Sequence, residues 1–193
     1  VHHLNNSRSQ RILWLLEELE VPYEIKKYQR DPVTYLAPKE LKEIHPLGKA
    51  PVITDGKTTI AESGAIIEYL IKKYGNGKIA NPTEGFESEQ LSYWMHFAEG
   101  SLMPPLVMKM VFDKINSSPL PFFVKPIAKM ISKNVMNSFI GPNINSNLNF
   151  IENHLKTNQW FIGSQFSGAD IQMSFPLEAG VSRIDNKTAY PNI

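Results

Sequence analysis

The stretch Ile44–Ile67 reads IHPLGKAPVITDGKTTIAESGAII and predicts a turn, a β-hairpin and a helix within two dozen residues. Asp55-Gly56 between two short β-prone runs is a strong hairpin signal. Pro51 cannot donate to a sheet ladder, so it belongs at the start or edge of a strand. Ser63 is a good residue to open the helix that follows. From this combination we expect a small pocket for a peptide-like anion.

The residues before this stretch predict a strand, a helix and a second strand. We expect the first strand over 1–4, a helix over 7–20 that stops before Pro22, and the second strand over 23–28. Residues 30–44 are irregular and polar, with room for one short helix. With the hairpin and a helix over 63–74, this order predicts a thioredoxin-like α/β domain over residues 1–74. A strand-helix-strand unit with a right-handed crossover favours a parallel pairing of its first two strands.

The residues after this domain predict a linker and an all-helical domain. Residues 75–85 are rich in Gly, Pro and Asn and read as the linker. The helical domain is expected over 86–193, with helices over 86–114, 122–139 and 142–156. Pro104-Pro105 must kink or break the first of these helices. Ser167 opens a last helix through a capping box with Asp170 and a hydrophobic staple between Phe166 and Ile171, a structural feature and not a site.

Composition limits the function classes. The net charge is +1 without a basic block, so nothing indicates a nucleic acid or a membrane as partner, and the apolar runs are too short for a membrane span. The chain has no cysteine, which excludes disulfides, thiolate metal sites and a catalytic thiol of its own, and fits a cytoplasmic protein. The five histidines lack the spacing of metal ligands, so we expect no metal.

Two short motifs carry a resemblance to a known family. Lys49-Ala50-Pro51 and Glu62-Ser63, with the hairpin between them, resemble the glutathione-binding half of the glutathione transferase family. SRSQR over 7–11, followed by ILWLLEEL, is most similar to serine-type bacterial and fungal members of the cytosolic type. The resemblance implies a helical-bundle C-terminal domain with a further helix beyond Ile193, and a cytoplasmic homodimer. It also implies a detoxification enzyme that adds glutathione, its co-substrate, to hydrophobic electrophiles or peroxides.

The same resemblance implies that Ser7 donates a hydrogen bond to the glutathione thiolate. A thiol of pKa about 8.5 becomes mostly ionised at neutral pH if its pKa falls by about two units, which needs about 2.7 kcal/mol. A charge-assisted hydrogen bond and the N-terminus of the first helix can supply this stabilisation. Two alternatives stay open. Ser7 and Gln10 fit a capping box, and Asn5, Asn6 or Ser9 could be the donor instead.

The other implied contacts hold the peptide. Ala50-Pro51 is expected to be a cis docking edge for an extended ligand, against the alternative of a trans proline at a strand edge. Glu62 would pair with the free amino group, and the helix N-terminus at Ser63 with the γ-glutamyl carboxylate; the alternative is plain capping and a solvated glutamate. Lys49 would meet the glycyl carboxylate or remain a surface lysine.

Two other functions remain compatible with these motifs. One is a non-catalytic binding or scaffold protein on the same fold, because a fold does not fix a function. The other is a glutathione-dependent disulfide reductase that uses two bound glutathione molecules, since the chain lacks a cysteine for a mixed disulfide of its own.

Overall fold

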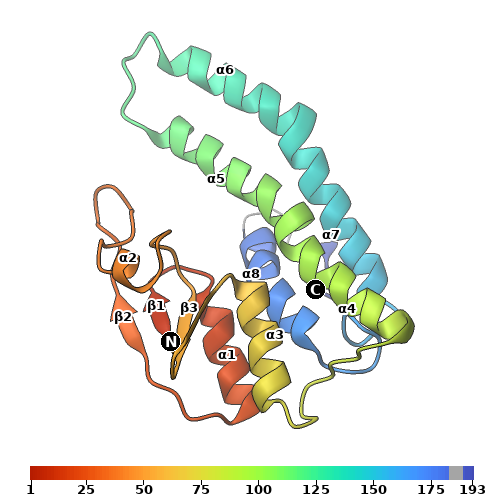
Figure 1. Cartoon of the computed structure of the whole chain (residues 1–193). Helices are drawn as coiled ribbons and strands as arrows, with labels where there is room; N and C mark the ends of the chain where they lie inside the picture. The colour runs from red at the N-terminus through yellow and green to blue at the C-terminus, as the bar shows by residue number, and fades with distance from the viewer. Residues whose placement is uncertain (183–188) are drawn as a thin grey trace. The chain divides into compact units, whose positions relative to one another are not determined.

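The computed structural model describes residues 1–182 and 189–193 and divides into two compact units (Figure 1). Unit 1 comprises Val1–Met95 and Trp160–Phe175, and unit 2 comprises His96–Gln159 and Pro176–Ile193. A segment late in the sequence therefore packs with the N-terminal residues. The domain boundaries expected at residues 74 and 86 stay a prediction.

Unit 1 is built on a four-stranded sheet with the strand order β2-β1-β3-β4. The strands are β1 (His2–Leu4), β2 (Lys26–Tyr28), β3 (Val52–Asp55) and β4 (Thr58–Ala61). β1 runs parallel to β2, while β3 is antiparallel to both β1 and β4. This topology confirms the predicted thioredoxin-like arrangement, although the second strand starts three residues later than expected.

The helices of unit 1 bury one apolar core. α1 (Ser9–Leu19) and α3 (Ser63–Tyr74) lie side by side (Figure 1), and α2 (Leu41–Ile44) is a single turn before the hairpin. The bounds of α3 match the prediction. The core consists of apolar side chains from the two longer helices, from β3 and from residues 79, 95 and 171: Ile12, Leu15, Leu16, Leu19, Ile53, Ile66, Ile67, Leu70, Ile71, Ile79, Met95 and Ile171.

Two long helical runs, each with a π-helical turn, lie mainly in unit 2. The first run joins α4 (Gly85–Phe97), which begins in unit 1, to η1 (Ala98–Leu102) and α5 (Met103–Ser117). The second joins α6 (Lys125–Val135), η2 (Met136–Ile140) and α7 (Gly141–Leu155). The elements α5 and α6 form a helical hairpin (Figure 1). Within the described residues, no helix combines the length and the apolar character needed to cross a membrane.

The π-helical turns lie where prolines interrupt the helical hydrogen bonds. Pro105 has no N–H for the carbonyl of Ser101, and Asn147 Nδ2 from α7 donates to that oxygen instead, at 2.9 Å. The predicted interruption at the proline pair is thus a π turn directly before α5. In the second run Gly141 precedes Pro142, and a Cβ at Gly141 would lie 2.8 Å from the carbonyl oxygen of Met136. The π turn therefore requires glycine there.

The predicted capping box at Ser167 is confirmed. Asp170 accepts hydrogen bonds from the Ser167 backbone N–H and hydroxyl, both at 2.8 Å, and from the Phe161 N–H at 3.0 Å. The Ser167 hydroxyl accepts from the Ala169 N–H and so caps α8 (Gly168–Val181). Burial raises the pKa of Asp170 more than these hydrogen bonds lower it. The box therefore anchors the start of α8 to the Phe161 segment.

Candidate functional site

The sheet register brings three of the predicted site segments to one end of unit 1. His2 pairs with Val52, and Val52 pairs with Ala61. The end of β1, the residues before β3 and the residues after β4 are therefore neighbours. These residues are Leu4 with the following loop to Ser7, Ala50-Pro51, and Glu62-Ser63.

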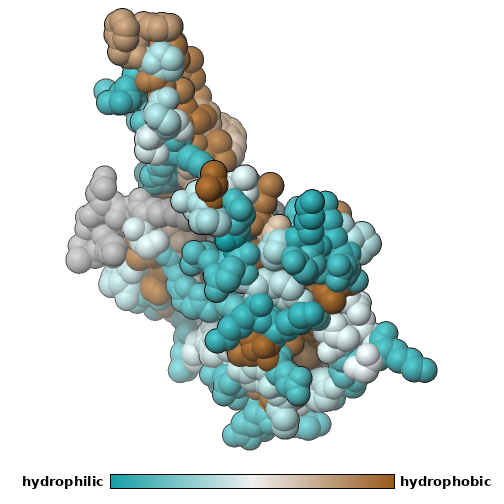
Figure 2. Space-filling view, turned by 90° about the vertical axis from the view of Figure 1, so that its left-hand side faces the viewer, coloured by the Kyte–Doolittle hydropathy of each residue, from teal (hydrophilic) through white to brown (hydrophobic). Residues whose placement is uncertain are grey.

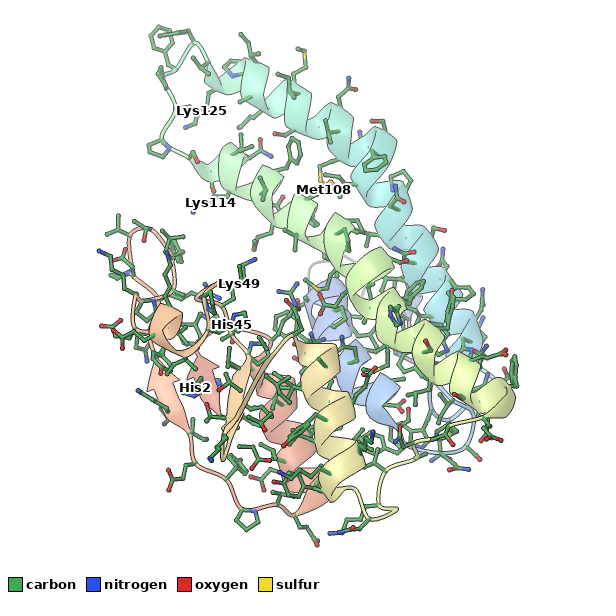
Figure 3. All side chains as sticks on the ribbon, in the orientation of Figure 1. His2, His45, Lys49, Met108, Lys114 and Lys125 are labelled. Carbon is green, nitrogen blue, oxygen red and sulfur yellow. The ribbon has the colours of Figure 1, made fainter. Side chains whose placement is uncertain are left out.

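Ala50-Pro51 forms an edge beside the end of β1. The bond is cis, which confirms the expectation, and Pro51 is buried directly before β3. Ala50 is half-buried, and no described residue hydrogen-bonds to its backbone. A free N–H and C=O beside a strand can pair with an extended peptide. Lys49 is exposed and, with His45, lies on the loop between α2 and β3 (Figure 3).

Glu62 and Ser63 form the turn from β4 into α3. The N-cap is Glu62, one residue earlier than predicted, with φ of 71° and ψ of 123° and no side-chain capping bond. A positive φ at a non-glycine residue is uncommon and is concentrated at functional sites. Glu62 is exposed, while Ser63 is 5% exposed. The first-turn N–H groups of α3 lack a side-chain cap, so this helix end can accept an anion.

Ser7 lies in the loop between β1 and α1 and is 7% exposed. Its hydroxyl donates to the carbonyl oxygen of Leu4 at 2.7 Å and lies 2.7 Å from Ser9 Oγ. The alternative in which Ser7 and Gln10 form a capping box is wrong, because α1 begins at Ser9 with Arg8 at its N-cap and without a side-chain capping bond. The backbone N–H groups at the start of α1 give the Ser7 hydroxyl one long hydrogen bond, of 3.3 Å, from the Ser9 N–H.

A chain of hydrogen bonds leads from His3 to Ser7. Because Ser7 donates to Leu4, the contact between the two serines requires Ser9 to donate, and Ser9 Oγ then accepts from His3 Nδ1 at 2.8 Å. Burial, followed by the charge of Lys27, lowers the pKa of His3 and so favours the neutral ring. The chain aligns the Ser7 O–H at its end. If that proton turns toward a ligand, the other bonds of the chain stay in place.

The other candidate donors differ in exposure and in partners. Ser9 is fully buried at 0% exposure. The side-chain oxygen of Asn5 accepts from the Arg30 N–H at 2.8 Å, which leaves its amide N–H group as the possible donor. Asn6 is exposed and has φ of 50°.

The structure adds Arg8 and Arg11, which sequence reasoning missed. Arg11 is 2% exposed, and its Nη1 donates to the Gln172 carbonyl oxygen at 2.6 Å. The guanidinium groups of Arg8 and Arg11 both lie within 6 Å of the Phe175 ring centroid. They add positive charge to the helix end that follows Ser7. The sequence feature that could have revealed this pair is Arg11, which lies four residues before Leu15 and so places a charge on the apolar face of α1.

A cavity of about 850 Å³ lies at the opposite end of the sheet and contains none of the predicted site residues. Asp55 lies in its wall and accepts hydrogen bonds from Lys73 Nζ at 2.7 Å, Tyr74 at 2.6 Å and Tyr69 at 2.8 Å. These bonds, the one from Lys73 first, lower the pKa of Asp55 to about 2. The carboxylate ties the hairpin to α3. Among the described residues, no three His, Asp or Glu side chains are grouped to hold a metal ion.

Comparisons with known proteins find similarity over the full chain. Residues 1–72 match the family model described as glutathione S-transferase, N-terminal domain, and residues 141–193 match that of the C-terminal domain. Glutathione S-transferase 3 of Schizosaccharomyces pombe is 40% identical over 193 residues, which cover all of this chain and 78% of that protein. Glutathione S-transferase 1 of Saccharomyces cerevisiae is 34% identical over 190 residues, 95% of this chain and 81% of that protein.

A solved structure shows the same similarity in three dimensions. A glutathione S-transferase from Actinobacillus pleuropneumoniae superimposes with a TM-score of 0.76 at 34% identity. The match covers 99% of this chain and 81% of that chain.

Proposed function

Because the chain belongs to the glutathione S-transferase family, we propose that it binds glutathione beside Ala50-Pro51 and activates its thiol at Ser7. The observation that carries the proposal is the register that brings Ser7, Ala50-Pro51 and Glu62-Ser63 to one end of the sheet. Each segment offers what a different part of an anionic tripeptide needs.

The peptide would be held mainly by backbone groups. The unpaired N–H and C=O of Ala50 accept it as an added strand segment. The uncapped start of α3 at Ser63 takes the γ-glutamyl carboxylate, and the exposed Glu62 pairs with the adjacent amino group. Lys49 is exposed on the neighbouring loop and meets the glycyl carboxylate.

Ser7 would stabilise the thiolate by exchanging one acceptor for another. In the structure the Ser7 hydroxyl donates to the Leu4 carbonyl, a neutral hydrogen bond that contributes about 0.5–1.5 kcal/mol. When the hydroxyl turns to the thiolate it donates to a charged acceptor instead, and such a bond contributes about 1.5–3 kcal/mol. Ser9 continues to donate to Ser7 Oγ and holds it in place. The start of α1 and the nearby charges of Arg8 and Arg11 supply further stabilisation.

The chemical step is attack by the sulfur on an electrophile. The thiol proton leaves to solvent, a carbon–sulfur bond forms, and the leaving group departs with the electron pair of the broken bond. With a peroxide, the sulfur takes one oxygen and the other leaves as an alcohol or water. We propose a hydrophobic electrophile as second substrate, a role in detoxification, and a homodimer in the cytoplasm.

Calorimetric titration with glutathione, together with turnover of a chloronitrobenzene, tests this function. We expect saturable binding, and conjugation at a rate well above the uncatalysed reaction. S-methylglutathione is the matched control, because it keeps the peptide contacts but cannot form a thiolate. Binding without turnover of chloronitrobenzenes or peroxides would favour the scaffold alternative, while turnover of glutathionyl disulfides alone would favour the reductase.

A further inference from the structure

The α5–α6 hairpin of unit 2 exposes an unusual amount of apolar surface. Its tip, residues 118–124, carries Phe122 and Phe123, which are 86% and 65% exposed and touch each other edge to face. Figure 2 shows hydrophobic atoms gathered over the end of this hairpin. The apolar surface continues along α6 through three side chains that are each more than half exposed: Ile127, Met130 and Ile131.

The same hairpin concentrates positive charge. Lys125, Lys129 and Lys133 follow one another at intervals of four along α6, so they form one stripe of the helix. They are exposed, and no described residue makes an ion pair with them. Residues 101–140 contain five lysines and one acid, Asp113, which pairs with Lys109. Figure 3 shows Lys114 and Lys125 on either side of the hairpin tip.

We propose that this hairpin tip docks on an anionic lipid surface. A helix with a lysine stripe, an apolar stripe and exposed phenylalanines is the pattern of interfacial membrane binding: the rings enter the headgroup region and the lysines meet lipid phosphates. A second copy fits less well, because a two-fold contact between these hairpins offers the lysines of α6 no free acidic partner: the single acid of residues 101–140, Asp113, already pairs with Lys109. The net charge of +1 gave no indication of a membrane partner. That value sums the basic hairpin with the rest of the chain, which is acidic.

Co-sedimentation with vesicles tests the proposal on the full chain. Vesicles of phosphatidylcholine with about one-third phosphatidylserine should bind the protein at low salt, and pure phosphatidylcholine vesicles should bind it far less. Binding should weaken as salt rises to about 0.5 M, because screening shortens the reach of the charges. Each lysine near such a surface strengthens partitioning about fivefold, so Lys125→Gln/Lys129→Gln/Lys133→Gln should weaken it about 100-fold.

Matched variants separate docking from a general loss of charge or apolar surface. Phe122→Ser/Phe123→Ser should weaken binding at least tenfold, while Phe86→Ser, at a ring 72% exposed in unit 1, should not. A triple variant of three exposed lysines of unit 1 controls for net charge: Lys39→Gln, Lys57→Gln and Lys72→Gln.

Three results would overturn the proposal. These are equal binding to both vesicle types, equal losses in the hairpin and control variants, and conversion of a dimer to a monomer by Phe122→Ser/Phe123→Ser in analytical ultracentrifugation. The last result would assign this face to a second copy of the chain.

Discussion

Replacing Ser7 with alanine should raise the pKa of bound glutathione by about one unit. The hydroxyl loses its hydrogen bond to Leu4 when it turns to the thiolate, so the net contribution of Ser7 is the difference between the charged and the neutral bond. That difference is about 1–1.5 kcal/mol, and 1.36 kcal/mol corresponds to one pKa unit. The rest of a two-unit shift would come from the start of α1 and its arginines.

Thiolate absorbance of bound glutathione, followed against pH, measures this shift. If the bound thiol has a pKa of about 6.5, the Ser7→Ala variant should fall from about three-quarters to about one-quarter ionised at pH 7. Glutathione affinity should change little, since the peptide contacts lie elsewhere. Ser7→Thr keeps a hydroxyl and should restore most of the ionisation.

Ser9→Ala is the matched control within the same network. It removes the partner of the Ser7 hydroxyl but leaves the proposed donor in place, so the shift should be in the same direction and smaller. An unchanged thiolate pKa in Ser7→Ala would refute the role of Ser7. Asn5 and Asn6 would then be tested next, while a larger shift in Ser9→Ala than in Ser7→Ala would make Ser9 the donor.

Three further predictions concern binding and stability. Glu62→Gln removes the charge that pairs with the amino group of glutathione and should weaken glutathione binding about tenfold in calorimetry. The turnover rate at saturating glutathione should not change. An unchanged affinity would contradict the contact. Asp170→Ala leaves three buried donors without their acceptor and should lower the free energy of unfolding, measured in urea, by about 3 kcal/mol. The control Asp113→Ala, at an exposed ion pair, should lower it by less than about 0.5 kcal/mol. Equal losses in the two variants would argue against the buried capping box. The pKa of Asp55 is lowered to about 2, so the stabilisation that its carboxylate gives is complete above about pH 4 and is lost as the pH falls toward 2. Asp55→Asn should therefore lower the melting temperature at pH 7 and make it depend less on acid pH. Curves of melting temperature against pH that run parallel for the variant and the wild type would refute this.

Net charge is a poor guide to the surface of this protein. The value of +1 gives no sign of a basic face, yet five lysines and one acid fall within the two helices that form the hairpin and the turns beside them. The spacing of the three α6 lysines was readable from the sequence. Their exposure depends on which face of α6 packs against α5, and this is a property of the folded unit.

The sequence by itself determined the elements whose causes are local. The Asp55-Gly56 turn fixes the hairpin, Glu62-Ser63 marks the start of α3, and the capping box at Ser167 needs only residues within one helical turn. The motif around Ala50-Pro51 also identified the family, because the order and spacing of its residues match the family pattern and can be read directly from the sequence.

Only the tertiary structure decided how these elements combine. Sheet register, which depends on contacts between distant residues, brings the loop of Ser7 to the same end of the sheet as Ala50-Pro51 and Glu62. Packing placed Trp160–Phe175 in unit 1, and it buried Ser9 against His3 and thereby aligned the hydroxyl at Ser7. Such contacts join residues far apart in the sequence or depend on burial, and no local pattern encodes them.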